Sequence, residues 1–274
     1  MYKTLTIVLI LILLNLTSES GAQSRPSLLF TAGLAFPGNE FAGELVSENE
    51  AGISYISSDF IKNNYAASTG ASVTGSLNFP FSSSGLFSSL LTGSYSYFNA
   101  FKSSIFGTTI ENNLSVPVSF DNRISVTTVA LGLQVSPAVS PKLSPFLNAN
   151  MGLNILSISL SRNDAASVIF SDAVRLGIIT NAGLTYKINN EYGFVLNGSY
   201  NMSNLFFKSS SDSYNDRIQY YSDDNQISDK EGSYYTNLSD PDYAPVKVEG
   251  NNKNVNWWSI NLGLNIMLGK SDKK

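Results

Sequence analysis

The stretch Trp258-Ser259-Ile260-Asn261-Leu262-Gly263-Leu264-Asn265-Ile266-Met267-Leu268 alternates between two kinds of side chain. Every even-numbered position is apolar, whereas the odd positions from 259 to 265 carry serine, asparagine or glycine. A period of two is that of a β-strand, because successive side chains of a strand point to opposite faces. The stretch therefore predicts a strand with one apolar face and one polar face.

The same alternation recurs in seven segments further upstream. They cover residues 28–36, 71–79, 91–97, 129–135, 147–160, 174–186 and 194–202. In the segment 147–160 the apolar parity changes at Leu156, which predicts a β-bulge near Ile155. The chain is therefore predicted to contain eight strands.

The connections between these segments alternate between short and long. Residues 80–85, 137–144 and 187–192 have turn compositions, whereas 37–67, 99–122, 161–172 and 207–255 are long. An even number of strands, short turns at one end and long loops at the other are typical of transmembrane barrels. We therefore predict an all-β, eight-stranded, antiparallel up-and-down transmembrane β-barrel with long extracellular loops.

A closed barrel satisfies every backbone hydrogen-bonding group, as a membrane requires, and its apolar face would then contact lipid. Alternation alone also allows a soluble lipocalin-like barrel, in which the apolar face points inward and holds a ligand. For the membrane barrel, aromatic residues near strand ends predict two interfacial girdles. They are Phe36, Phe79, Tyr97, Phe98, Tyr186, Tyr192, Trp257 and Trp258.

Residues 1–22 have the features of a cleaved signal peptide. Lys3 precedes an apolar run over 5–14, and Ser20-Gly21-Ala22 forms a small-residue cleavage site. The run is too short to span a bilayer. We therefore expect export and a single barrel domain over residues 23–274.

With its export signal, eight strands and unequal loops, the chain resembles the small outer-membrane β-barrel proteins of Gram-negative bacteria, the outer-membrane-protein-A-like and X-like barrels. In that family the barrel-assembly machinery reads a signal in the last strand, which Asn261, Gly263, Ile266 and Leu268 match here. Residues 269–274 replace the terminal aromatic residue of many members. The resemblance implies an outer-membrane location, with lipid and the assembly machinery as partners, and a structural or surface-binding role.

Composition argues against several other functions. The chain has no Cys and no His, and therefore lacks thiolate ligands and the commonest general base. Outer-membrane barrels that are enzymes rely on a His, so we expect no catalysis and no cofactor. With 17 basic and 21 acidic residues the chain offers no field for nucleic acid.

The connection 207–255 is rich in acidic residues and tyrosine. The tyrosines are Tyr214, Tyr220, Tyr221, Tyr234, Tyr235 and Tyr243. Tyrosine with serine, asparagine and glycine is typical of adaptable binding surfaces, so we hypothesise a contact surface for an extracellular partner here. The acidic residues lack the spacing of an EF-hand, and a solvated loop is a simpler interpretation than a calcium site.

Two arginines lie within predicted strands. Arg175 is on the polar face, where a buried charge requires an acidic partner that the sequence does not identify. Arg123 is interpreted as an interfacial anchor. A lumen filled by side chains should not conduct, although a narrow channel remains the alternative function.

Overall fold

The structure is a computed structural model. It describes residues 25–38, 40–42, 47–50, 53–56, 65, 67–100, 108–111, 114–117, 120–162, 168–169, 171–209, 227–230 and 252–269. The expected signal peptide, residues 1–22, and the six tyrosines of the connection 207–255 lie outside the described residues.

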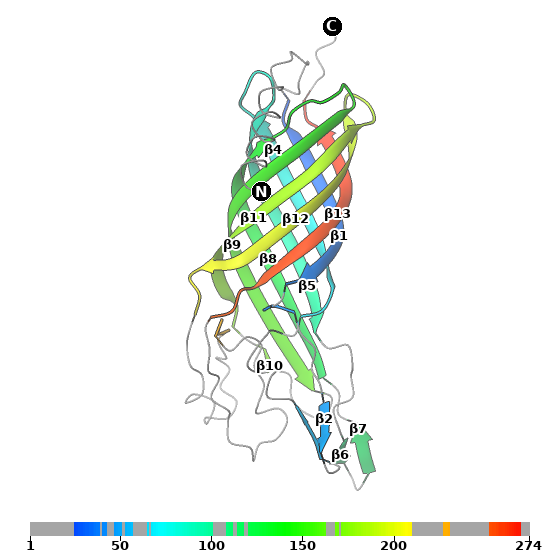
Figure 1. The fold of residues 1–274 in the computed structure, drawn as a ribbon, viewed down its shortest axis with the longest axis vertical. Coiled ribbons are helices and arrows are strands. Elements are labelled where there is room, and N and C mark those ends of the chain that lie inside the picture. Colours follow the sequence, from blue (N-terminus) through cyan, green and yellow to red (C-terminus); the bar gives the residue numbers. More distant parts are fainter. Residues whose placement is uncertain are drawn as a thin grey trace, which may run out of the picture.

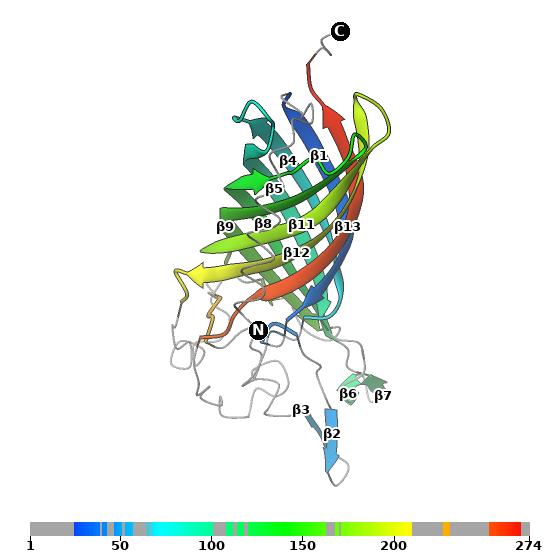
Figure 2. The ribbon, with the colours of Figure 1, turned by 45° about the horizontal axis from the view of Figure 1, so that its top comes forward.

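Eight strands form one closed antiparallel barrel (Figures 1 and 2). They are β1 (Ser27–Pro37), β4 (Gly70–Pro80), β5 (Phe87–Ala100), β8 (Phe120–Val135), β9 (Leu143–Arg162), β11 (Ala173–Lys187), β12 (Tyr192–Phe206) and β13 (Asn256–Met267). Strand β1 pairs with the last strand, β13, and β8 pairs with β9, so that no edge is left open. The prediction of an eight-stranded up-and-down barrel is confirmed.

The remaining strands are short and lie in the long connections. Strands β2 (Ser47–Glu50) and β3 (Ile53–Ile56) form one hairpin, and β6 (Thr108–Glu111) and β7 (Leu114–Pro117) form another. Strand β10 (Val168–Ile169) extends the pairing of β9. Within the described part of the chain, no helix is long and apolar enough to span a membrane.

Side chains on the barrel wall follow the predicted orientation. Along β13, Trp258, Ile260 and Leu262 are 59%, 59% and 66% exposed, whereas the intervening Ser259 and Asn261 are buried in the lumen. A lipocalin-like barrel has the opposite orientation, and this excludes that alternative. The outer wall is therefore apolar, and most of the lumen is lined by hydroxyl and amide groups.

The predicted bulge near Ile155 is wrong. Strand β9 keeps an unbroken register through Ile155 with both of its neighbours. Leu156 and Ile158 instead keep the inward parity of Asn154 and are buried. The apolar parity changes because the lining of the lumen becomes apolar toward the long connections.

The same change of lining corrects the predicted girdles. Phe98 and Trp257 point into the barrel and are buried, although both were predicted at the membrane interface. Phe36, Phe79 and Trp258 are exposed on the outer wall.

The seam between the first and last strands depends on Gly263. A Cβ atom at this position would lie 1.9 Å from the backbone oxygen of Phe30, so that strand β1 would have to move. We expect Gly263→Ala to destabilise the barrel by about 1–3 kcal/mol, as overpacking usually does. Urea titration in lipid vesicles measures this change. Gly93→Ala is the matched control, because a Cβ atom there meets nothing within 4 Å. Equal unfolding midpoints for the two variants would contradict the steric explanation.

Candidate functional site: the closed mouth of the barrel

The mouth of the barrel is the end that carries the long connections, at the bottom of Figure 1. Its inner wall is apolar, with Ile124 and Val126 from β8 and Leu156 and Ile158 from β9 all buried. Because water is excluded there, any polar group in the mouth needs a protein partner.

Four aromatic side chains cross the mouth, and we call them the aromatic seal: Phe41, Tyr65, Phe98 and Trp257. The ring of Phe98 packs edge-on against Phe41 at 4.9 Å and against Trp257 at 5.4 Å, measured between ring centroids. Tyr65 packs on Phe41 at 5.6 Å. All four side chains are almost fully buried, so the seal closes the lumen next to the long connections.

A short segment of the connection between β12 and β13 enters the mouth beside this seal. Ile227, Ser228 and Asp229 are all buried, and the side chain of Asp229 has no exposed surface. We call residues 227–230 the Asp229 latch. The interpretation of the whole connection 207–255 as a solvated loop is therefore wrong for this segment.

The carboxylate of Asp229 accepts four hydrogen bonds. The donors are Arg175 Nε at 2.7 Å, Asn204 Nδ2 at 2.6 Å, the backbone N–H of Ser209 at 2.7 Å and the hydroxyl of Tyr65 at 3.2 Å. A buried carboxylate is tolerated when it is paired and its remaining lone pairs are bonded, and both conditions are met here.

Arg175 lies on the inward face of β11, and its side chain is 8% exposed. Besides the ion pair with Asp229, it donates from Nη2 to the backbone oxygen of Ile227 at 3.1 Å and from Nη1 to that of Val174 at 3.1 Å. The guanidinium therefore pairs with the carboxylate of Asp229 and also donates a hydrogen bond to the backbone of the latch.

A bulge in β12 builds the other half of this site. Leu176 pairs with Phe206 and Ile178 with Met202, so one residue of β11 faces three residues of β12, Ser203 to Leu205. Bulges re-aim side chains, and here Ser203 and Asn204 are both buried although they are consecutive.

Asn204 uses this position to join three segments. Its Nδ2 donates to Asp229 and, at 2.9 Å, to the backbone oxygen of Lys253, while its Oδ1 accepts from the N–H of Val255 at 2.7 Å.

Backbone hydrogen bonds also connect the latch to the residues after β12 and to the residues before β13. The N–H of Asp229 donates to the backbone oxygen of Ser209 at 2.8 Å, and the N–H of Lys253 donates to the backbone oxygen of Asp229 at 2.7 Å. Glu40, from the connection after β1, accepts from the N–H of Asn254 at 2.5 Å. Two long connections therefore meet at one buried carboxylate.

On the short-turn side of the seal, small polar side chains that face the lumen are joined by hydrogen bonds. Ser72 donates to Asn261 Oδ1 at 2.8 Å, and Thr128 donates to Asn154 Oδ1 at 2.6 Å. Side chains thus occupy much of the lumen as well as the mouth, as expected for a barrel of eight strands.

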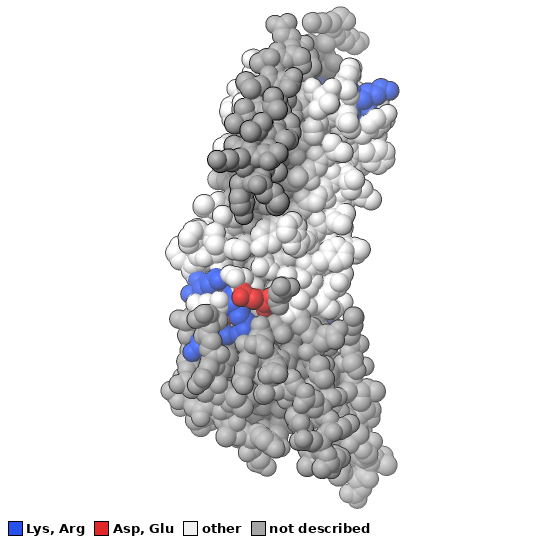
Figure 3. All heavy atoms as spheres, in the orientation of Figure 1, with Lys and Arg blue, Asp and Glu red and all other residues white. Residues whose placement is uncertain are grey.

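Exposed charged side chains among the described residues lie near the two ends of the barrel. On the described surface visible in Figure 3, Lys, Arg, Asp and Glu appear near the short turns and around the mouth, with uncharged wall between them. The exposed Arg123 belongs to the mouth end of β8.

Other predicted positions have clear places in the structure. Of the residues that match the assembly signal, Asn261 points into the lumen, Gly263 lies at the seam, Ile266 is half-buried near the end of β13, and Leu268 follows that end. Among the described residues, no group of three or more acidic side chains is placed to hold a metal ion.

Comparisons with known proteins find similar structures only. No family model matches the chain, and no curated protein matches it in sequence. Neisserial surface protein A aligns with 91% of this chain and 100% of its own, at 12% identity and a TM-score of 0.44. The attachment invasion locus protein of Yersinia pestis aligns with 89% of this chain and 100% of its own, at 12% identity and a TM-score of 0.37.

The same Yersinia pestis protein, in complex with the heparin analogue sucrose octasulfate, aligns with 88% of this chain and 99% of its own, at 12% identity and a TM-score of 0.38. Similarity this low supports no conclusion about ligands. The barrel architecture rests on the strand pairing described above.

Proposed function

We propose that the chain is an outer-membrane barrel with a sealed lumen, which holds surface loops in place for binding an extracellular partner. One observation carries this proposal: apolar side chains face outward along the wall while the mouth is closed by the aromatic seal and the Asp229 latch. An apolar wall between two charged ends suits a bilayer. Export by residues 1–22 and recognition of Asn261, Gly263, Ile266 and Leu268 by the barrel-assembly machinery belong to the same proposal.

The latch suggests how the tyrosine-rich connection is organised. It anchors residues 227–230 in the mouth, and the connection is thereby divided into the stretches 210–226 and 231–251. Each stretch carries three of the six tyrosines. Anchoring both ends of a loop lowers the conformational entropy that is lost on binding. We therefore propose two separately anchored contact surfaces in place of a single long loop.

The proposed role is binding without catalysis or transport. The chain has no His, and the buried acid of the mouth already accepts four hydrogen bonds, so it cannot serve as a free general base. The aromatic seal opposes conduction. Single-channel steps of the purified protein in planar bilayers would favour the narrow channel over this proposal.

Topology can be tested by cysteine labelling, because the chain has no cysteine of its own. We expect Tyr220→Cys and Tyr243→Cys to react with a membrane-impermeant maleimide on intact cells. Ser83→Cys, in the short turn between β4 and β5, should react only after lysis. Labelling of Ser83→Cys on intact cells, or protection of both tyrosine positions, would contradict the proposed orientation.

The binding role is tested by shortening each half of the connection separately. Deleting 212–224 or 233–249 leaves the latch in place, whereas deleting the whole loop would remove Asp229 and leave Arg175 unpaired. We expect each deletion to reduce adhesion of expressing cells to immobilised glycans and proteins, with unchanged barrel stability. Unchanged adhesion in both deletion variants would count against a contact surface in this connection.

A further inference from the structure

The four groups that donate to the carboxylate of Asp229 all lie outside the latch. Oδ1 of the carboxylate accepts from Asn204 Nδ2 and the hydroxyl of Tyr65. Oδ2 accepts from Arg175 Nε and the N–H of Ser209. These donors come from β11, from β12 and the residue range after it, and from the connection between β1 and β4. The mouth therefore supplies the donors, and the latch supplies the acceptors.

This set of donors fits a carboxylate with a single negative charge. Two donors point at each oxygen, which matches the two acceptor sites of a carboxylate oxygen. Arg175 is the one charged group among the four donors, and it balances one negative charge. Arg175 and Asn204 are both more than nine-tenths buried, so water competes little for these hydrogen bonds.

The mouth also binds the backbone around this carboxylate. The N–H of Asp229 donates to the backbone oxygen of Ser209 at 2.8 Å, and the backbone oxygen of Asp229 accepts from the N–H of Lys253 at 2.7 Å. Arg175 Nη2 donates to the backbone oxygen of Ile227 at 3.1 Å. Backbone hydrogen bonds accept any peptide, whereas the side-chain site selects an acidic residue. The donors therefore fit a short peptide segment that contains one aspartate.

The contacts that hold the latch are mostly polar. Ile227 is the one apolar side chain among residues 227–230. Another acidic peptide reproduces the hydrogen bonds of the latch, because it carries the same acceptors. A tethered ligand competes with one from outside by mass action, at an effective concentration that its tether sets. The latch is therefore an internal ligand that an external acidic segment can replace.

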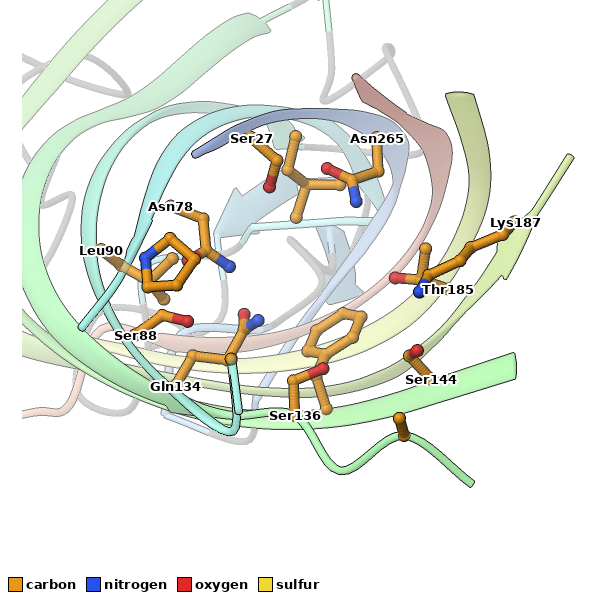
Figure 4. Close-up of a pocket in the computed structure, with 15 residues that line it drawn as sticks. Ser27, Asn78, Ser88, Leu90, Gln134, Ser136, Ser144, Thr185, Lys187 and Asn265 are labelled. Carbon is orange, nitrogen blue, oxygen red and sulfur yellow. The ribbon is translucent and has the colours of Figure 1, made fainter. Parts of the chain in front are cut away.

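The pocket at the short-turn end of the lumen has a different character. Uncharged polar side chains such as Ser88 and Gln134 surround it, and Lys187 is its one charged lining residue (Figure 4). Two of its amide oxygens, Asn78 Oδ1 and Asn265 Oδ1, are buried without a hydrogen-bond donor. A carboxylate would add further acceptors to this pocket. Of the two ends of the described lumen, the mouth is thus the one that suits an acidic ligand.

We propose that the mouth is a binding site for an acidic peptide segment, occupied by Asp229 in the free protein and by a segment of a partner protein after exchange. Exchange releases residues 227–230 and joins the stretches 210–226 and 231–251 into one loop. Binding in the mouth therefore changes how the tyrosine-rich connection is presented. This inference goes beyond the proposed function, because it requires neither the tyrosines nor a bilayer.

Exchange is tested with Ile227→Cys, because Ile227 is buried and the chain has no cysteine of its own. We expect a maleimide to label this variant slowly in detergent micelles. The end-blocked peptide Ile-Ser-Asp-Lys should accelerate labelling, about tenfold at ten times its dissociation constant for the released mouth. The matched peptide Ile-Ser-Asn-Lys lacks the charge and should leave the rate unchanged. Equal labelling rates with the two peptides would overturn the proposal.

The donors themselves are tested with Asp229→Gly, which removes the carbon and oxygen atoms of one acetate ion. Sodium acetate should raise the thermal unfolding midpoint of this variant in detergent micelles, relative to sodium chloride at equal ionic strength. Arg175→Met combined with Asp229→Leu lacks the guanidinium, so the two salts should act alike on it. A folded Asp229→Gly variant that acetate does not stabilise would overturn the proposal.

Both measurements are separate from the tests of the proposed function. They use purified protein in micelles, and neither depends on adhesion or on labelling of intact cells. Loss of the surface-binding role would leave the effects of the peptide and of acetate unchanged. Absence of both effects would remove the site in the mouth and leave the anchored loops in place.

Discussion

Asp229→Ala is expected to destabilise the barrel by about 3–5 kcal/mol, the usual effect of removing one partner of a buried ion pair. The substitution leaves Arg175 charged in an apolar mouth, and it removes the acceptor for Asn204, Tyr65 and the N–H of Ser209. Urea titration in phospholipid vesicles should show the loss as a lower unfolding midpoint. Glu191→Ala is the control, because Glu191 is an exposed carboxylate in a short turn.

A second variant isolates the ion pair itself. Replacing both partners of a buried pair by apolar residues is often close to neutral, so Arg175→Met combined with Asp229→Leu should recover most of the stability lost in Asp229→Ala. If Asp229→Ala matched the wild type, the carboxylate would not hold the mouth closed.

Leu262→Arg is expected to destabilise the inserted barrel by about 2–4 kcal/mol, as a cation at the centre of the bilayer does. Leu262 lies in the middle of β13 and is 66% exposed on the outer wall. The loss should appear in vesicles as a lower unfolding midpoint and a lower yield of inserted barrel.

The control for this prediction is the same substitution at a position nearer the edge of the bilayer. Phe81 is also exposed, but it lies at the short-turn end after β4, where a charge reaches the membrane interface. Phe81→Arg should therefore destabilise the barrel by only about 0–1 kcal/mol. Equal losses for Leu262→Arg and Phe81→Arg would mean that the wall does not face a bilayer.

The architecture could be predicted from the sequence because alternation is a local property. In β13, for example, Ile260 and Leu262 reveal both the strand and its outer face, and the same parity places Arg175 in the lumen. The predictions failed where the lumen stops being polar. Leu156, Phe98 and Trp257 were assigned by their apolar character, yet they point inward because the mouth is sealed by apolar side chains.

The partner of Arg175 could not be predicted for a different reason. Asp229 is one of nine acidic residues between 207 and 255, and no periodicity distinguishes it from the others. Its burial depends on the bulge of β12, which turns Asn204 inward, and on Tyr65 from a distant connection. These contacts join residues that lie far apart in the sequence, so no local pattern reveals them.

The orientation of the wall is tested most directly by fluorescence quenching in vesicles of lipids brominated along their acyl chains. Trp258→Phe and Trp257→Phe each leave a single tryptophan. Bromine should strongly quench Trp258, which is exposed on the outer wall, and leave the emission of the buried Trp257 nearly unchanged. Strong quenching of Trp257 together with an unquenched Trp258 would contradict a barrel whose apolar face contacts lipid.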